Sequence, residues 1–183
     1  NTGAGRSSLL PSFELGQPSR LVGAAPVPSA FSEPVLQEIA KNNKRPIVFA
    51  LSNPTSKAEC TAKEAYDFTS GKVVFASGTK FPLDSAAPQF QPGFANNAFI
   101  FPGVARGTIA CKASSVTSGM FLAAAERLAK EVTREDLLVG SVFPKTIDKL
   151  SDVARAVGVA VAERAEKDGV ARIESGGNAF FSV

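Results

Sequence analysis

RPIVFALSNPTSKAE, the stretch from Arg45 to Glu59, decides the fold. Its residues 47–51 form a short, unbroken apolar run rich in β-branched and aromatic side chains. Such a run predicts a strand that is covered on both faces, as in a parallel sheet. Pro54 then ends the strand because it lacks a backbone donor. Thr55 or Ser56 can cap a following helix, with Glu59 in its first turns, so the predicted unit is strand, tight turn and helix.

Asn53 is predicted to lie at the carboxyl end of this strand. Ligands of open α/β sheets bind at that edge, and an uncharged amide can both donate and accept hydrogen bonds there. Asparagine before proline is also common in turns, where it only shapes the backbone. Both interpretations of Asn53 are open on local chemistry alone.

The same alternation of apolar runs and helical patterns continues along the chain. Ser32 is a plausible N-cap for a helix with a buried stripe of Val35, Leu36 and Ile39, and Thr61 and Glu64 have the spacing of a capping box. Strands are predicted at 21–25, 47–51, 72–76 and 98–101, and helices at 33–41, 57–69, 119–132 and 147–168, with a short turn at 133–138. This order predicts an α/β fold: a Rossmann-like, mostly parallel sheet flanked by helices, with a helical C-terminal part.

A second group of amides, Asn96 and Asn97, precedes the predicted strand at 98–101. Pro102 is expected to break that strand, and Gly103 and Gly107 are small enough to allow close backbone approach. The long loop at 79–95 has a length typical of functional or disordered segments. The two asparagines fit either an Asn-rich turn beside a core strand or a binding site.

Composition excludes several classes of function. The chain has 183 residues, a net charge of +3 and no histidine, so it contains no His-based triad and no His-ligated metal site. Lysine and arginine form no basic stripe, which argues against nucleic acid as a partner. No apolar run approaches the roughly 18 residues that span a bilayer. Cys60 and Cys111 give no disulfide framework, so we expect a soluble intracellular protein in a reducing compartment.

The two ends of the chain differ from its body. Residues 1–18 are rich in Gly, Ser and Pro and are expected to be a flexible or atypical lead-in, because the TGAGR segment at 2–6 follows no predicted strand. Residues 170–183 are expected to be a tail beyond Gly169, which is predicted to end the last helix. The body of the chain is therefore placed at 19–169.

Two stretches of that body resemble signatures of malic enzymes. One is FALSNPTSKAECT at 49–61, and the other is GFANNAFIFPGVARG at 93–107. Shorter matches are AFSE at 30–33, RPI at 45–47 and FASG at 75–78. They follow the family's order over about residues 21–165, so the body is identified as part of a malic enzyme NAD(P)-binding domain.

The resemblance implies an oxidoreductase that converts L-malate to pyruvate and carbon dioxide with NAD or NADP and Mg²⁺ or Mn²⁺. It implies that Asn53, Asn96 and Asn97 bind the substrate. It also implies that Ser52, Asn53, Gly78 and Asn97 lie against the cofactor. The full-length enzyme is expected to be a homo-oligomer.

Several features of the family have no counterpart in this sequence. Its tyrosine acid, lysine base, acidic metal ligands and glycine-rich dinucleotide loop lie in earlier parts of the chain, and residues 1–18 resemble none of them. Tyr66, the sole tyrosine, is predicted to lie in the core, and Lys57 and Lys80 have no obvious buried setting. We therefore expect no catalytic residue and no metal ligand in this chain. The alternative is a truncated, non-catalytic remnant that serves as a nucleotide-binding or interaction module.

Overall fold

A computed structural model describes residues 9–81, 91–144 and 150–173. The chain forms two compact units. The sheet unit comprises residues 1–95 and 135–142, and the helical unit comprises residues 96–134 and 143–183. The TGAGR segment, most of the loop at 79–95, the predicted start of the last helix at 147 and most of the tail lie outside the described residues.

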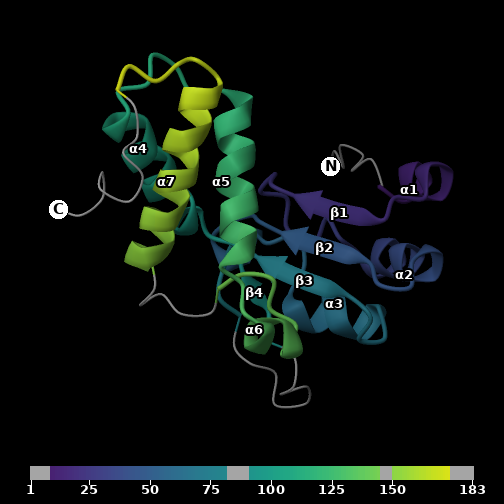
Figure 1. The fold of residues 1–183 in the computed structure, drawn as a ribbon. Helices are drawn as coiled ribbons and strands as arrows, with labels where there is room; N and C mark the ends of the chain where they lie inside the picture. The colour runs from purple at the N-terminus through teal and green to yellow at the C-terminus, as the bar shows by residue number, and fades with distance from the viewer. Residues whose placement is uncertain (1–8, 82–90, 145–149, 174–183) are drawn as a thin grey trace. The chain divides into compact units, whose positions relative to one another are not determined.

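The sheet unit is built on four parallel strands (Figure 1). They are β1 (Arg20–Gly23), β2 (Ile47–Ala50), β3 (Val74–Ser77) and β4 (Gly93–Phe94), hydrogen-bonded in the order β1-β2-β3-β4. The predicted α/β class and the parallel sheet are thus confirmed. The first three strands lie within two residues of their predicted bounds.

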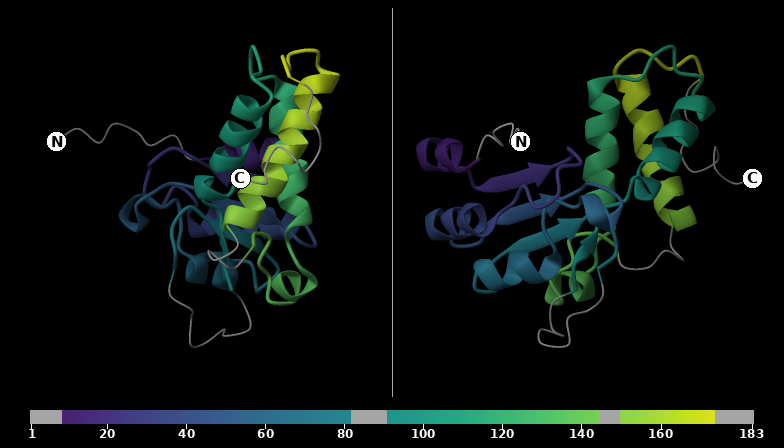
Figure 2. Two further views of the ribbon diagram at one scale, coloured as in Figure 1. Left: turned by 60° about the vertical axis from the view of Figure 1, so that its left-hand side comes forward. Right: turned by 180° about the vertical axis from the view of Figure 1, so that it is seen from behind.

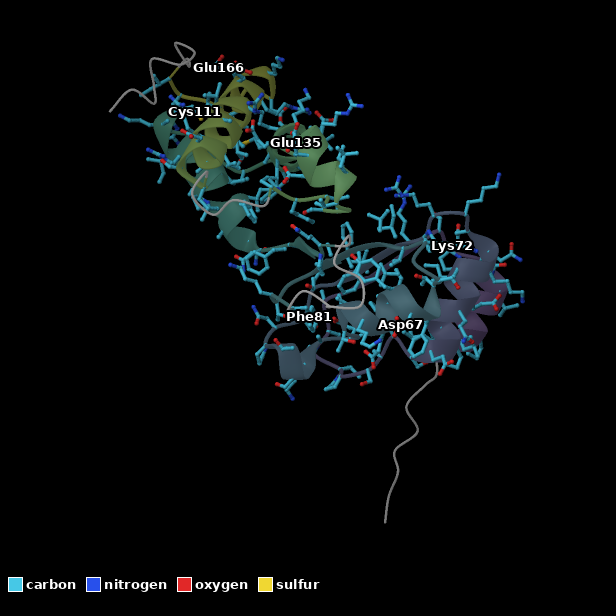
Figure 3. All side chains as sticks on the ribbon, turned by 90° about the horizontal axis from the view of Figure 1, so that it is seen from below. Asp67, Lys72, Phe81, Cys111, Glu135 and Glu166 are labelled. Atoms are coloured by element: carbon cyan, nitrogen blue, oxygen red, sulfur yellow. The ribbon has the colours of Figure 1, made fainter. Side chains whose placement is uncertain are left out.

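One row of side chains across the sheet explains where the core lies. Leu21, Val48 and Phe75 are partners in register on β1, β2 and β3, and all three are buried. They share one cluster with residues of α2 (Glu33–Asn42) and α3 (Ala62–Phe68), so both helices cover the same face of the sheet (Figure 2). Phe81 extends this cluster, with its ring centroid 6.4 Å from that of Phe75 (Figure 3).

The helices of the sheet unit begin where local capping chemistry allows. α3 starts at the predicted capping box, in which the Thr61 hydroxyl accepts from the Glu64 amide and the Glu64 carboxylate accepts from the Thr61 amide. The prediction of a helix from Lys57 is wrong. Thr55–Lys57 is one turn of 3-10 helix (η1), and Ala58 returns to extended geometry. The sheet unit also contains the short helix α1 (Leu10–Gly16) and all of α6 (Arg134–Leu138) except its first residue.

The predicted strand at 98–101 is also wrong. The fourth strand is Gly93–Phe94, and the chain then forms a 3-10 turn, η2 (Asn97–Phe99), followed by helix α4 (Phe101–Ala110). The Asn96 side chain starts the turn by accepting from the Ala98 amide at 2.8 Å. Pro102 lies in the first turn of α4, where a missing N–H costs nothing, so it begins a helix instead of breaking a strand.

The helical unit packs α4 and α5 (Ser118–Lys130) against α7 (Leu150–Lys167). Small residues on α4 bring the first pair close. A Cβ added at Gly103 would lie 2.5 Å from the Cβ of Val157, and one added at Gly107 would lie 2.5 Å from the carbonyl oxygen of Gly158. The close approach predicted for these glycines is therefore a helix-to-helix contact.

The ends of α5 and α7 are tied together. Thr117 caps α5 by accepting from the Met120 amide, and its hydroxyl donates to Asp168 at 2.5 Å. Gly169 has a φ of +70° and follows the last turn of α7, as predicted. Beyond it, the amides of Arg172 and Ile173 both donate to the carbonyl of Cys111 (labelled in Figure 3).

Candidate functional site

The carboxyl ends of β1, β2 and β3 are joined by backbone hydrogen bonds. The Leu51 amide donates to the Gly23 carbonyl at 2.8 Å, and the Gly78 amide donates to the Ala50 carbonyl at 2.9 Å. These bonds continue the sheet ladder into the segments that follow the strands. They bring Ser52, Asn53 and Gly78 to one edge of the sheet, and the strand-end position predicted for Asn53 is confirmed.

Asn53 is exposed at this edge. Its Nδ2 donates to the Gly78 carbonyl at 3.3 Å, and the peptide bond to Pro54 is cis. The Asn53 carboxamide oxygen makes no hydrogen bond to another described residue. The amide nitrogen is thus held by Gly78, the residue that follows β3, and the amide oxygen is available to a ligand.

Ser52 points away from solvent. It is buried, its amide donates to Glu59 Oε2 at 3.3 Å, and its hydroxyl donates to Glu59 Oε1 at 2.5 Å. The Ser52 hydroxyl is therefore already engaged within the chain. Any contact that Ser52 makes with a cofactor has to use other atoms of the residue.

Gly78 lies where two backbones nearly touch. A Cβ added there would be 2.2 Å from the Leu51 carbonyl oxygen and 2.8 Å from the Leu51 carbonyl carbon. Real Cβ atoms do not approach backbone this closely, so glycine is required for the ends of β2 and β3 to meet. The Gly78 carbonyl also accepts a hydrogen bond from the Asn53 side-chain amide, so this residue helps to position Asn53.

Asn96 and Asn97 belong to the helical unit. Asn96 uses its side-chain oxygen to cap η2, whereas Asn97 is exposed in that turn and its side chain bonds no other described residue. Asn97 is therefore the freer of the two amides. The substrate-binding role that the resemblance implies for Asn53, Asn96 and Asn97 stays a prediction.

Of three titratable side chains in the sheet unit, Tyr66 and Cys60 are buried and Lys80 is exposed. Burial raises the pKa of the Tyr66 phenol to about 12, and the Tyr66 ring packs edge-on against Phe75. Burial first, and then the charges of Glu64 and Glu59, raise the pKa of the Cys60 thiol to about 12. Lys80 is exposed, with its Nζ 5.5 Å above the ring of Phe94. The core position predicted for Tyr66 is confirmed.

Glu59 is the residue of this edge whose place the sequence did not predict. It was expected in the first turns of a helix, and it instead lies in the segment between η1 and α3, 1% exposed and bonded to Ser52. A local signal was present, since Glu59 is flanked by Ala58 and Cys60, two residues of types common in cores.

Two features of the described residues concern metals and membranes. No group of three or more His, Cys, Asp or Glu side chains in residues 9–81, 91–144 and 150–173 is placed to hold a metal ion. Within the same ranges, no helix combines the length and the apolar character needed to cross a bilayer.

The family model described as "Malic enzyme, NAD binding domain" matches residues 4–166 of this chain. The match includes residues 4–18, which the motif resemblance had left out. The proposed division at 18 and 169 into lead-in, body and tail stays a prediction.

Curated relatives agree with this match. The chain is 44% identical over 168 residues to the mitochondrial NAD-dependent malic enzyme of Ascaris suum, covering 91% of this chain and 26% of the relative. It is 42% identical over 154 residues to the NADP-dependent malic enzyme of Homo sapiens, covering 83% of this chain and 26% of the relative. The chain thus spans about a quarter of the length of these relatives.

A solved structure shares the fold. The malic enzyme from Pyrococcus horikoshii Ot3 superposes with a TM-score of 0.66 at 27% sequence identity, covering 88% of this chain and 33% of that one. The strand-end asparagines and the small-residue helix contact thus lie in a chain that resembles malic enzymes in both sequence and structure. The chain belongs to the malic enzyme family, through its NAD-binding domain.

Proposed function

We propose that this chain forms the sheet-edge part of a malic enzyme active site. The reaction is the oxidative decarboxylation of L-malate to pyruvate and carbon dioxide with NAD or NADP. The observation that carries this proposal is the Asn53 carboxamide, which is held by the Gly78 carbonyl through its nitrogen and keeps its oxygen available at the carboxyl end of β2. That edge is where parallel sheets bind ligands.

We propose that each of the two freer amides, Asn53 and Asn97, binds a polar group of malate. A carboxamide can hold a hydroxyl or a carboxylate without adding a group that takes up or releases protons. Ser52 and Gly78 line the same edge through their backbones, and Asn96 supports the turn that carries Asn97. Bound NAD or NADP would supply the acceptor for the hydride that malate loses.

The rest of the reaction is assigned to parts of a malic enzyme that this chain does not contain. The described residues do not fit Mg²⁺ or Mn²⁺, so no step is routed through a metal here. We assign the metal ligands, the proton-transfer groups and the homo-oligomer contacts to the remainder of the enzyme. Two free, buried cysteines favour a reducing intracellular compartment.

Kinetics of amide variants test the proposal. The chain replaces its matching segment in the Ascaris suum enzyme, to which it is 44% identical, and the chimera is assayed with malate and NAD. Asn53→Ala and Asn97→Ala each remove a hydrogen bond to a charged ligand, worth about 1.5–3 kcal/mol, and should lower kcat/KM for malate roughly ten- to hundredfold.

Asn42→Ala is the matched control, because Asn42 is an exposed amide of α2 that bonds Glu38. It should leave kcat/KM unchanged. Kinetics of Asn53→Ala and Asn97→Ala that equal those of Asn42→Ala would show that both amides only form turns. A chimera that binds NAD but never turns over malate would favour a non-catalytic nucleotide-binding module.

A further inference from the structure

Glu59 is a buried carboxyl residue beside the proposed site. It is 1% exposed, and no described lysine or arginine forms an ion pair with it. Burying a carboxyl group without an ionic partner costs free energy, and hydrogen bonds offset only part of that cost. A residue of this kind calls for a role other than packing.

Both carboxyl oxygens of Glu59 serve one residue. Oε2 accepts from the Ser52 amide at 3.3 Å, and Oε1 accepts from the Ser52 hydroxyl at 2.5 Å. Ser52 directly precedes Asn53, so the two bonds close the loop of residues 52–59 at the point where the proposed ligand-binding amide begins.

The end of β1 leaves room for the Glu59 side chain. A Cβ added at Gly23, the last residue of β1, would lie 2.7 Å from Cδ of Glu59. The Glu59 carbonyl accepts from the Phe31 amide at 3.0 Å, which fixes the residue from its backbone as well. Glu59 thus packs against the end of β1 and is bonded to the segment before α2, while its side chain bonds Ser52 after the end of β2.

We propose that Glu59 is a positioning residue for Asn53. By fixing the Ser52 amide and hydroxyl, it sets the direction in which the chain leaves β2, and this direction points the Asn53 carboxamide at the Gly78 carbonyl. Glu59 is too buried to contact malate or nicotinamide itself. The proposal rests on the proposed function, which gives Asn53 its part in malate binding.

Three variants separate this role from general stability. Glu59→Gln keeps the side chain's size but replaces one acceptor oxygen with a donor group, so the Ser52 amide and hydroxyl can no longer each donate to an oxygen of their own. Ser52→Ala removes the hydroxyl bond alone. Glu64→Gln is the matched control, because the Glu64 carboxylate also accepts from a backbone amide and a hydroxyl, both of Thr61, but at the exposed start of α3.

Nuclear magnetic resonance of the 183-residue chain gives the direct readout. Glu59→Gln and Ser52→Ala should both move and broaden the Asn53 side-chain amide signals. Glu59→Gln should also speed hydrogen exchange at the Ser52 amide at least about tenfold, the loss expected for one hydrogen bond. Glu64→Gln should leave both unchanged. Unaltered Asn53 signals in Glu59→Gln would overturn the proposal, and if that variant does not fold, unaltered signals in Ser52→Ala would do the same.

Kinetics of the chimera supply an independent readout. In Glu59→Gln, a smaller fraction of the enzyme should hold Asn53 in its binding orientation. KM for malate should therefore rise roughly tenfold, with kcat little changed. Because Glu59 acts through Ser52, the double variant Glu59→Gln/Ser52→Ala should be no worse than Glu59→Gln alone. Additive effects would mean that Ser52 acts independently and would overturn the proposal.

The two proposals fail in different ways. If Asn53→Ala impairs malate kinetics and Glu59→Gln does not, the positioning role is overturned while the proposed function stands. If Asn53→Ala and Asn97→Ala are both without effect, the proposed function fails, and the malate-linked role of Glu59 fails with it.

Discussion

Gly78 is the residue at which backbone geometry leaves least freedom. Its neighbours within reach are the carbonyl and Cα atoms of Leu51, and backbone atoms cannot swing away as a flexible side chain can. The Gly78 carbonyl also accepts a hydrogen bond from the Asn53 side-chain amide. A change here therefore affects the sheet and the proposed site together.

Gly78→Ala should destabilise the chain by about 3 kcal/mol, because the added methyl group forces β2 and β3 apart. Urea unfolding followed by circular dichroism measures the change in the free energy of unfolding. Gly16→Ala is the control, since a Cβ at Gly16 meets nothing within 4 Å, and it should be neutral. Equal stability of the two variants would mean that the ends of β2 and β3 do not meet as described.

The buried thiol of Cys60 should make stability depend on alkaline pH. Its pKa is raised from 9.0 to about 12 in the folded chain, so above pH 9 the unfolded chain loses a proton that the folded chain keeps. The folded state then binds more protons, and stability should fall by up to about 1.4 kcal/mol per pH unit as pH rises toward 12.

Cys60→Ala tests this dependence, because it removes the thiol while leaving Tyr66, whose pKa is raised in the same direction. The slope of unfolding free energy between pH 9 and 10.5 should be shallower in Cys60→Ala than in the parent. A thiol reagent at pH 8 should also leave Cys60 unmodified until urea is added. Identical slopes in the two proteins would contradict the raised pKa.

At the scale of elements, capping chemistry decided which predictions succeeded. The start of α3 could be predicted, since Thr61 and Glu64 satisfy each other's backbone amides without help from distant residues. The helix predicted from Lys57 failed because Glu59 bonds Ser52 across the loop, a contact that no local pattern encodes.

The strand predicted at 98–101 failed for a different reason. Apolar runs of that length fit a strand or a buried helix equally well, and Pro102 was taken as a breaker although proline also suits the first turn of a helix. For the proposed site residues too, features set by local sequence could be predicted, and features set by contacts between distant residues could not. Asn53 was placed correctly at a strand end, whereas the direction of the Ser52 hydroxyl depends on its bond to the buried Glu59 and could not be read from spacing.

Thr61→Ala should cost about 1 kcal/mol of stability, because it removes the hydroxyl that accepts from the Glu64 amide. Ser32→Ala is an informative control. Ser32 occupies the same N-cap position before α2, but its side chain makes no capping hydrogen bond, so its loss should be close to neutral. Urea midpoints of the two variants give the comparison, and a larger loss in Ser32→Ala would reverse the assignment of the caps.

At the scale of the whole molecule, we expect the chain to carry the sheet edge of the site and none of the enzyme's proton-transfer groups. We predict that the purified 183-residue chain does not turn over malate with NAD or NADP and Mn²⁺. Tyr66 is buried with a pKa near 12, which does not suit a proton donor at neutral pH. Absorbance of the reduced cofactor measures turnover, and the active chimera is the positive control. Sustained turnover by the chain alone would show that a group such as Lys57 or Lys80 has a catalytic role.

The sheet unit is not continuous in sequence, because residues 135–142 return to it after the chain has entered the helical unit. The returning segment is integral, since the Gln91 amide donates to the Val139 carbonyl at 2.9 Å and Asp136 and Ser141 are buried. A ribosome that makes this chain must therefore translate α4 and α5 before the sheet unit has all its residues. Neither unit can be expressed as an uninterrupted fragment, and a gene that encodes the sheet unit alone would need a designed link between residues 95 and 135.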